Sequence, residues 1–161
     1  QGPCFGGGVG LVSVCDIAVG TSRVAFTLSE VKLGLLPATI SPYVVRRMGE
    51  AQARRYFLTA EKIGAEAARG MGLLHEVVES ADELDAWEAH FREALTVASP
   101  TGVAATKDLI AAVAGQEITT DLINDTARRL CDQRAAPEGV EGLTAFFEKR
   151  PAAWNTTAQK K

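Results

Sequence analysis

The sequence predicts an α/β fold, with short strands and helices in the first half of the chain and helices alone in the second. Residues 1–78 alternate short apolar runs with turns and short helical stretches, whereas residues 79–161 follow a helical period almost throughout. The chain has 161 residues, 47% hydrophobic and 23% charged, which is average for a globular protein with a sizeable core. We therefore expect two regions, 1–78 and 79–161.

The first strand leads into an unusual concentration of glycine. The segment CFGGGVGLVSVCDIAVG, residues 4–20, follows an apolar strand that ends at Phe5 and contains four closely spaced glycines: Gly6, Gly7, Gly8 and Gly10. Glycine loses more backbone freedom on folding than any other residue, so these positions need a reason. A helix over roughly residues 8–15 would have unpaired N-terminal amides that favour a negatively charged ligand. An anion site is one interpretation, and close packing of strand against helix is the other.

Two glycine-rich nucleotide-binding motifs do not match this segment. A P-loop ends in Gly-Lys-Ser/Thr, and no such ending follows. In a dinucleotide fold, G-x-G-x-x-G is needed, but Leu11 or Ser13 stands where the third glycine belongs. Glu30 has the offset of a ribose-binding acid, yet the strand expected over roughly 17–20 ends well before it. A nucleotide-dependent oxidoreductase is therefore a remote alternative.

A single acid follows the next strand. In AFTLSEVKLGLLP, residues 25–37, Phe26 and Leu28 alternate with polar neighbours like a strand end, and Glu30 then lies among apolar residues. Such a glutamate either faces solvent or an ion-pair partner, or is a partly buried carboxyl group suited to moving protons near neutral pH. Backbone amide donors together with one such carboxyl group suit chemistry at the carbon next to a carbonyl. Glu30 is therefore a candidate catalytic residue.

Helix start signals divide the second half of the chain. A capping box, Ser80 with Glu83, precedes a helix whose apolar residues share one face: Leu84, Trp87, Phe91 and Leu95. Ser99-Pro100 predicts a helix that extends as far as Gly115, and a further helix is expected over residues 120–133. The apolar face of a last helix is marked by Val140, Leu143, Phe146 and Phe147. Ser41-Pro42 predicts a similar start in the first half.

Composition excludes several classes of protein. A net charge of −3 and a pI near 5.4 provide no basic surface for nucleic acid, and no apolar run approaches the length of a membrane span. Three widely spaced cysteines, Cys4, Cys15 and Cys131, indicate reduced thiols that are buried and structural rather than catalytic. We expect a cytoplasmic protein with no nucleic-acid partner and no membrane partner.

The order of the motifs resembles the crotonase (enoyl-CoA hydratase/isomerase) family. The resemblance covers nearly the whole chain: FGGGVGL, CDIAV, AFTLSEVKLGLLPA, RRMG, RYFLTAEKIGAEAARGMGLLHEVV and EGLTAFFEKR, in that order. It implies a ββα spiral whose C-terminal portion is residues 1–78, followed by a helical oligomerisation region, residues 79–161. Family members carry a further N-terminal part ahead of the glycine run, so we expect the chain to be the C-terminal part of a subunit. A homotrimer or a hexamer is implied.

The resemblance also implies roles for two residues. The family holds the thioester oxygen of an acyl-CoA between two backbone N–H groups, of which one matches Gly7 and the other lies in the N-terminal part. Hydratases of the family usually carry two glutamates, of which the second matches Glu30 and the first falls at Gly10, which has no side chain. The leading interpretation is an enoyl-CoA hydratase. The alternatives are a Δ3,Δ2-enoyl-CoA isomerase with one carboxyl group and a non-catalytic subunit that binds acyl-CoA.

Further positions match substrate contacts of the family: Gly6, Gly10, Leu36, Pro37, Phe146 and Lys149. Helix packing for Phe146 and a solvated charge for Lys149 are the structural alternatives. Many members have a second glycine cluster where this chain has Ala38 to Pro42, and the version Ile40-Ser41-Pro42-Tyr43 looks like hydratases of branched-chain or methylglutaconyl-type acyl-CoA breakdown. No metal and no redox cofactor is implied, because the thioester itself accepts the electron pair.

Overall fold

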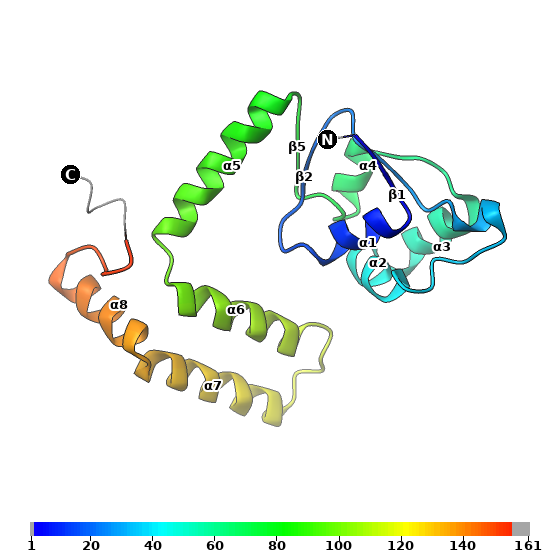
Figure 1. The fold of residues 1–161 in the computed structure, drawn as a ribbon. Coiled ribbons are helices and arrows are strands. Elements are labelled where there is room, and N and C mark those ends of the chain that lie inside the picture. The colour runs from blue at the N-terminus through cyan, green and yellow to red at the C-terminus, as the bar shows by residue number, and fades with distance from the viewer. Residues whose placement is uncertain (1, 156–161) are drawn as a thin grey trace. The chain divides into compact units, whose positions relative to one another are not determined.

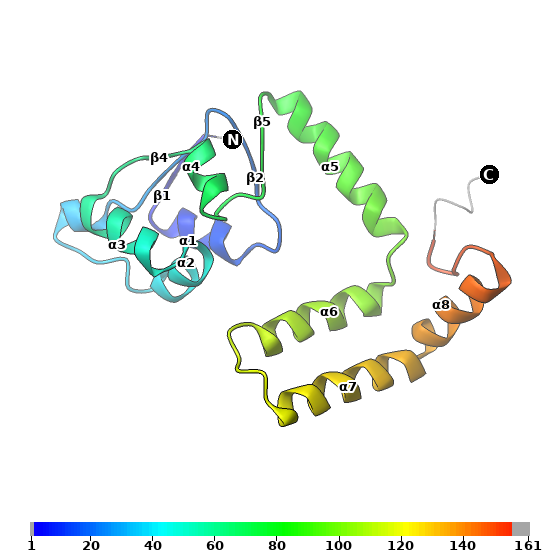
Figure 2. The same cartoon turned by 180° about the vertical axis from the view of Figure 1, so that it is seen from behind.

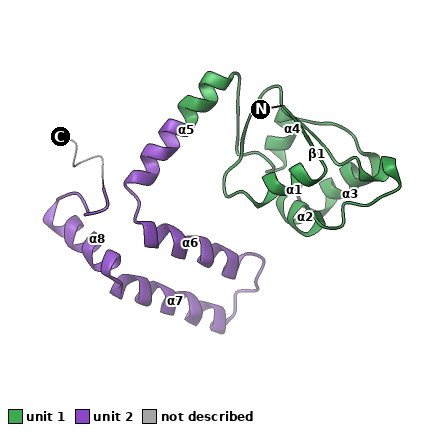
Figure 3. Ribbon diagram, viewed as in Figure 1, with its two compact units in different colours: residues 1–88 green, residues 89–161 purple. Residues whose placement is uncertain are grey.

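The computed structural model describes residues 2–155 and divides the chain into two compact units, residues 1–88 and residues 89–161 (Figure 3). The boundary falls inside helix α5 (Ala81–Thr96), ten residues beyond the boundary that we expected from the sequence.

The first unit contains short strands and short helices (Figure 1). Its elements are β1 (Pro3–Phe5), α1 (Gly7–Val14), β2 (Val19–Thr21), β3 (Ala25–Thr27), the 3-10 helix η1 (Glu30–Leu33), α2 (Ser41–Met48), α3 (Glu50–Thr59), β4 (Ile63–Gly64), α4 (Ala65–Gly70) and β5 (Glu76–Val78). The α/β prediction is therefore confirmed. The first strand ends at Phe5 as predicted, and the helix after it begins one residue earlier than predicted.

Two small sheets organise these elements. Strand β1 pairs in parallel with β3, with Phe5 opposite Thr27, and β3 pairs antiparallel with β4. Strand β2 pairs in parallel with β5. Parallel neighbours need a crossover connection, and α1 with β2 supplies it between β1 and β3. The ends of β1 and β3 therefore lie at one edge, so the glycine run after β1 and Glu30 after β3 come close together.

A single apolar cluster fixes that edge. Its fully buried side chains come from β3 and the residue that follows it, from β4, α1 and α2, and from the turn before β5: Phe26, Leu28, Ile63, Val9, Val44 and Leu73. Helix α1 packs on α2, and α2 packs on α3, as both views of the ribbon show (Figures 1 and 2). Because Val9 and Leu28 are each at most 1% exposed, the segments that carry the glycine run and Glu30 are anchored on the core.

The start of α2 differs from the prediction. Ser41 is the first residue of the helix rather than its cap, and its hydroxyl donates to the carbonyl of Ala38 at 2.9 Å. The Ser41 N–H already donates to the carbonyl of Pro37 at 3.0 Å, so the chain turns before the serine is reached. Ile40 therefore precedes the helix directly.

Helices form the second unit. They are the end of α5, α6 (Pro100–Val113), α7 (Thr120–Ala135) and α8 (Pro137–Glu148), and α6, α7 and α8 contact one another. The predicted caps are confirmed at two of the starts. Ser80 accepts from the N–H of Glu83 at the start of α5, and Ser99 accepts from the N–H of Gly102 at the start of α6.

Candidate active site

The site is built at the turn between β1 and α1. The Gly6 N–H donates to the carbonyl of Thr27 at 3.0 Å, which extends the pairing of β1 with β3 by one residue. Gly6 then adopts φ 45° and ψ −115°, a conformation that side-chain-bearing residues rarely adopt, and helix α1 begins at Gly7. The glycine at position 6 is therefore required by the backbone itself.

The amide of Gly7 is available to a ligand. Gly7 is exposed, it is the first residue of α1, and its N–H has no hydrogen-bond partner among residues 2–155. The first N–H groups of a helix lack partners within the helix, and the helix dipole makes them favourable donors to negative charge. This geometry fits the oxyanion donor that the sequence predicts, and the catalytic role of Gly7 stays a prediction.

Glu30 reaches the same turn from β3. It is the first residue of η1, and a Cβ atom built on Gly6 would lie 2.9 Å from its Oε1 atom. Its Oε2 atom is buried and has no hydrogen-bond partner within the described part of the chain. A buried carboxylate oxygen without a partner is uncommon in proteins and needs an explanation, such as a catalytic role. The structure thus brings Glu30 beside the Gly6–Gly7 turn.

The nearest cation in the sequence is directed elsewhere. Lys32, two residues after Glu30, donates from Nζ to the carbonyl of Ala60 at 3.1 Å. Ala60 follows α3 in a left-handed conformation, so the ammonium group satisfies the carbonyl end of that helix. This agrees with the expectation that Glu30 is partly buried without a Lys or Arg partner.

Gly10 lies within α1, in close contact with Ile40. It is buried, and a Cβ atom built on it would lie 2.8 Å from the Cβ of Ile40 and closer still to Cγ2. Ile40 is the residue that the sequence prediction missed at this site. The signal was present, because a glycine inside a helix costs about 1 kcal/mol relative to alanine and indicates a close approach.

The other predicted substrate contacts are spread along the chain. Leu36 is 72% exposed and Pro37 is buried, in the segment between η1 and α2. Phe146 and Lys149 belong to the second unit, where Phe146 is 75% exposed and Lys149 follows α8 with a left-handed φ of 53°. Their contact with a substrate stays a prediction.

The three thiols differ in exposure, and the expectation that all of them are buried is wrong for two. All three cysteines are free. Burial raises the pKa of the Cys4 thiol, which is the opposite of the change that a nucleophile needs. The thiol of Cys15 is exposed, contrary to our expectation of burial, and donates to the carbonyl of Leu11, while Nδ1 of His75 accepts from the Ala18 N–H at 3.0 Å. Cys131 is also exposed.

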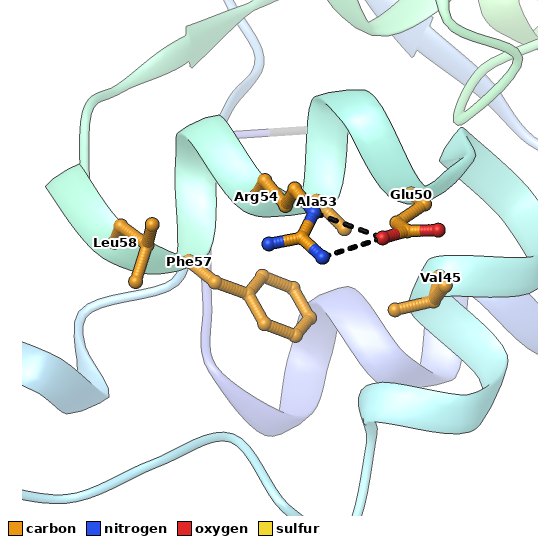
Figure 4. A pocket seen from close by; sticks show the side chains of 6 residues that line it. All are labelled: Val45, Glu50, Ala53, Arg54, Phe57 and Leu58. Atoms are coloured by element: carbon orange, nitrogen blue, oxygen red, sulfur yellow. Dashed lines mark hydrogen bonds and ion pairs between the residues drawn. The ribbon is translucent and has the colours of Figure 1, made fainter.

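A groove on the first unit contains none of the predicted site residues (Figure 4). It is an open hollow of about 280 Å³ between α2 and α3, lined by Val45, Glu50, Ala53, Arg54, Phe57 and Leu58. Arg54 points toward Glu50 across one turn of α3 and pairs with it at 2.7 Å. This exposed pair contains none of the predicted site residues.

Residues 2–155 contain no cluster of three or more His, Cys, Asp or Glu side chains placed to hold a metal ion. None of the helices in this range is both long and apolar enough to span a membrane.

Comparison with known families agrees with this geometry. The family model described as enoyl-CoA hydratase/isomerase matches residues 1–157. The chain therefore belongs to the enoyl-CoA hydratase/isomerase family, the crotonases.

Individual relatives are similar over most of this chain. The enoyl-CoA hydratase AKT6-1 of Alternaria alternata is 40% identical over 93% of this chain and 50% of its own length. Human mitochondrial methylglutaconyl-CoA hydratase is 32% identical over 94% of this chain and 45% of its own length. The crystal structure of an enoyl-CoA hydratase from Shewanella pealeana superposes with a TM-score of 0.90 at 45% identity, over 96% of this chain and 57% of that one. The chain thus spans about half the length of the curated relatives that it matches.

Proposed function

We propose that the protein is an enoyl-CoA hydratase that adds water across the α,β double bond of an acyl-CoA thioester. The observation that carries the proposal is the buried, unpartnered Oε2 atom of Glu30 beside the free amide of Gly7. Membership of the enoyl-CoA hydratase/isomerase family supports the reaction class.

The proposed reaction uses one carboxylate and one backbone amide from this chain. As the water oxygen bonds to the β-carbon, the carboxylate of Glu30 takes a water proton and the π electrons move toward the thioester oxygen. The Gly7 N–H donates to that oxygen, where negative charge develops; one such donor contributes about 100- to 1000-fold in rate. Glu30 then returns the proton to the α-carbon. The resemblance implies a second donor, which we take to come from polypeptide outside residues 1–161.

The remaining expectations belong to the same proposal. We propose that Phe146 and Lys149 contact the CoA moiety, and that Leu36 and Pro37 border the acyl group. Assembly as a trimer or hexamer would cover the exposed apolar faces of α6, α7 and α8. The reaction as written uses no metal and no redox cofactor, and we propose a cytoplasmic location.

A second candidate function is favoured by one observation. Position 10, where the first glutamate of many hydratases falls, is occupied by a buried glycine under Ile40. A Δ3,Δ2-enoyl-CoA isomerase needs only one carboxylate, which takes a proton from one carbon and returns it to another. The same Glu30 would perform that step.

The test compares Glu30→Gln with Glu50→Gln in the full-length protein. Glutamine keeps the size of Glu30 but cannot accept the proton, so we expect turnover of crotonyl-CoA to fall by about 10²- to 10⁴-fold with an unchanged circular dichroism spectrum. Glu50→Gln removes the exposed pair with Arg54 and is expected to keep full activity. Hydration is followed as the loss of absorbance of the conjugated thioester. Turnover of Glu30→Gln within a few-fold of wild type would remove Glu30 from the mechanism.

A further inference from the structure

The close contact between Gly10 and Ile40 leaves no room for a side chain at position 10 unless Ile40 moves. Gly10 does not have a left-handed φ, so an L side chain is compatible with its backbone, and space is what limits this position. A Cβ atom there would lie 2.8 Å from the Cβ of Ile40, below the 3.0 Å that real Cβ atoms respect. Rotation about the χ1 angle of Ile40 moves Cγ2 but leaves Cβ in place, so a change of rotamer does not relieve the contact.

The backbone of Ile40 is held in place. Its carbonyl accepts from the N–H of Val44 at 3.0 Å and from the N–H of Tyr43 at 3.1 Å, which forms the first turn of α2. Its side chain packs against the buried apolar cluster. A larger residue at position 10 would therefore have to displace the start of α2, which is a costly change in a packed interior.

Positions 10 and 40 are complementary in size. In the hydratases that this chain resembles, a glutamate falls at position 10 and many members have a glycine cluster over positions 38–42. Here the glycine is at position 10 and a bulky apolar residue is at position 40. The observed contact links the two positions, since a Cβ atom at position 10 and the side chain of Ile40 do not fit together in their observed places.

We propose that Ile40 closes position 10 to a carboxylate, because its side chain fills the space that the stem of a glutamate there would need. This proposal rests on the proposed function. With position 10 closed, Glu30 moves the proton without a second carboxylate from that position. A site with one carboxylate is less able to activate water than a site with two. It therefore shifts the balance of reactions from hydration toward migration of the double bond, in which the single carboxylate returns a proton to carbon.

The first experiment measures the contact without any substrate. Gly10→Ala, Ile40→Gly and the double variant are unfolded with urea, and the coupling between the two positions is obtained from the cycle. Ile40→Gly is used because alanine would keep the Cβ atom. We expect Gly10→Ala to lower the equilibrium constant for folding in the wild-type background. In the Ile40→Gly background, the factor by which the same substitution lowers this constant should be about ten times smaller. Additive effects of the two changes would overturn the proposal.

The second experiment measures selectivity in the full-length protein. The swap variant Gly10→Glu/Ile40→Gly restores a carboxylate and the space for it. We expect its ratio of crotonyl-CoA hydration to isomerisation of a β,γ-unsaturated acyl-CoA to rise about tenfold or more, because a second general base assists only the water step. Ile40→Gly alone supplies the space without the carboxylate and is expected to stay within about threefold of the wild-type ratio.

The outcomes separate the two proposals. An unchanged ratio in a folded swap variant, with an active wild type, overturns the role of Ile40 and leaves the proposed function standing. A full-length wild type that converts neither substrate overturns the proposed function and the role of Ile40 with it.

Discussion

Residues 1–88 bury a cluster of large apolar side chains, whereas the described part of residues 89–161 buries Ala145 and little else that is apolar. Several of the largest apolar side chains in the second unit are exposed: Ile110, Ile118, Leu130, Phe146 and Phe147. Polar contacts replace the missing core. The first unit is therefore specified by packing, whereas the helices of the second unit depend on their ends and on further apolar partners.

The helix starts show the same difference. Helices α1, α2, α3 and α4 begin without a side-chain cap, whereas Ser99 and Thr119 cap α6 and α7. Glu138, from the first turn of α8, also reaches the start of α6. Its carboxylate accepts from the hydroxyl of Ser99 at 2.5 Å and from the N–H of Thr101 at 3.0 Å. These hydrogen bonds hold the pKa of Glu138 below its usual value.

The largest effect is expected from removing an aromatic side chain from the core of the first unit. Phe26→Ala deletes a ring that is 2% exposed, and such deletions cost about 3–5 kcal/mol. Phe147→Ala deletes a ring that is 75% exposed and is expected to change the free energy of unfolding by less than about 0.5 kcal/mol. Urea unfolding followed by circular dichroism measures both. Equal effects would contradict the contrast between the two units.

The second prediction concerns a close approach of backbones in the helical unit. A Cβ atom at Gly139 would collide with the carbonyl oxygen of Gln133 and lie 3.0 Å from the Cα of Arg134, where α7 turns into α8. Gly139→Ala is therefore expected to destabilise the protein by about 1–3 kcal/mol despite the better helix propensity of alanine. Gly70→Ala, where nothing lies within 4 Å, is the control and should be neutral or stabilising. A stable Gly139→Ala variant would show that this junction is adaptable.

Local signals in the sequence predicted the starts of α5, α6 and α7 well, because side chains at these starts act on the nearest amides. Ser80, Ser99 and a start at Thr120 were visible as patterns, whereas α8 begins without a side-chain cap. The hydrogen bonds from the start of α6 to Glu138 in α8 could not be predicted from the sequence, since they join residues that are 37 to 39 positions apart. No pattern within one helix contains that information.

The candidate site was partly predictable for a similar reason. The glycine run and Glu30 were distinguished by residue type and by family resemblance, and the parallel pairing of β1 with β3 brings them together. Ile40 could not be assigned, because its effect depends on how closely α1 and α2 approach. Gly10 indicated that something lies close to it, but only the packed structure identifies the neighbour.

A third prediction tests the dependence of the second unit on caps. Ser99 accepts from the Gly102 N–H at 2.9 Å and donates to Glu138, so Ser99→Ala is expected to lower the free energy of unfolding by about 1 kcal/mol. Ser13 is buried in α1 and donates to the carbonyl of Val9 in the same helix. Such a bond back to the helix contributes little, so Ser13→Ala should have the smaller effect. The reverse order, measured by thermal unfolding, would contradict the comparison.

The smallest effect on stability at neutral pH is expected from removing the exposed ion pair between Glu141 and Arg150. The contribution of this pair to stability is measurable in acid. Arg150 donates to both oxygens of Glu141, at 2.6 and 2.9 Å, and the Ala153 N–H donates to Oε1 at 2.8 Å. These hydrogen bonds, that of Arg150 first, lower the pKa of Glu141 to about 2. A carboxyl group with a lowered pKa in the folded state stabilises the fold above its unfolded pKa, and the stabilisation is lost as the pH falls through the folded value. The contribution of Glu141 is therefore complete above about pH 5 and disappears between about pH 4.5 and pH 2.

Glu141→Gln removes this titration and should flatten the loss of melting temperature in that pH window, with only a small change at pH 7 because exposed pairs contribute little. Glu50→Gln, which removes an exposed pair in the first unit, is the matched control and should leave the acid slope of the second unit unchanged. Melting curves are recorded from pH 2 to pH 7 in a Trp87→Phe background, so that the indole signal comes from Trp154 alone. This signal reports on the second unit because the Trp154 ring donates to the carbonyl of Val97. An acid slope that is the same in Glu141→Gln and wild type would show that the Arg150 pair does not stabilise this unit, and that its helices are held by other contacts.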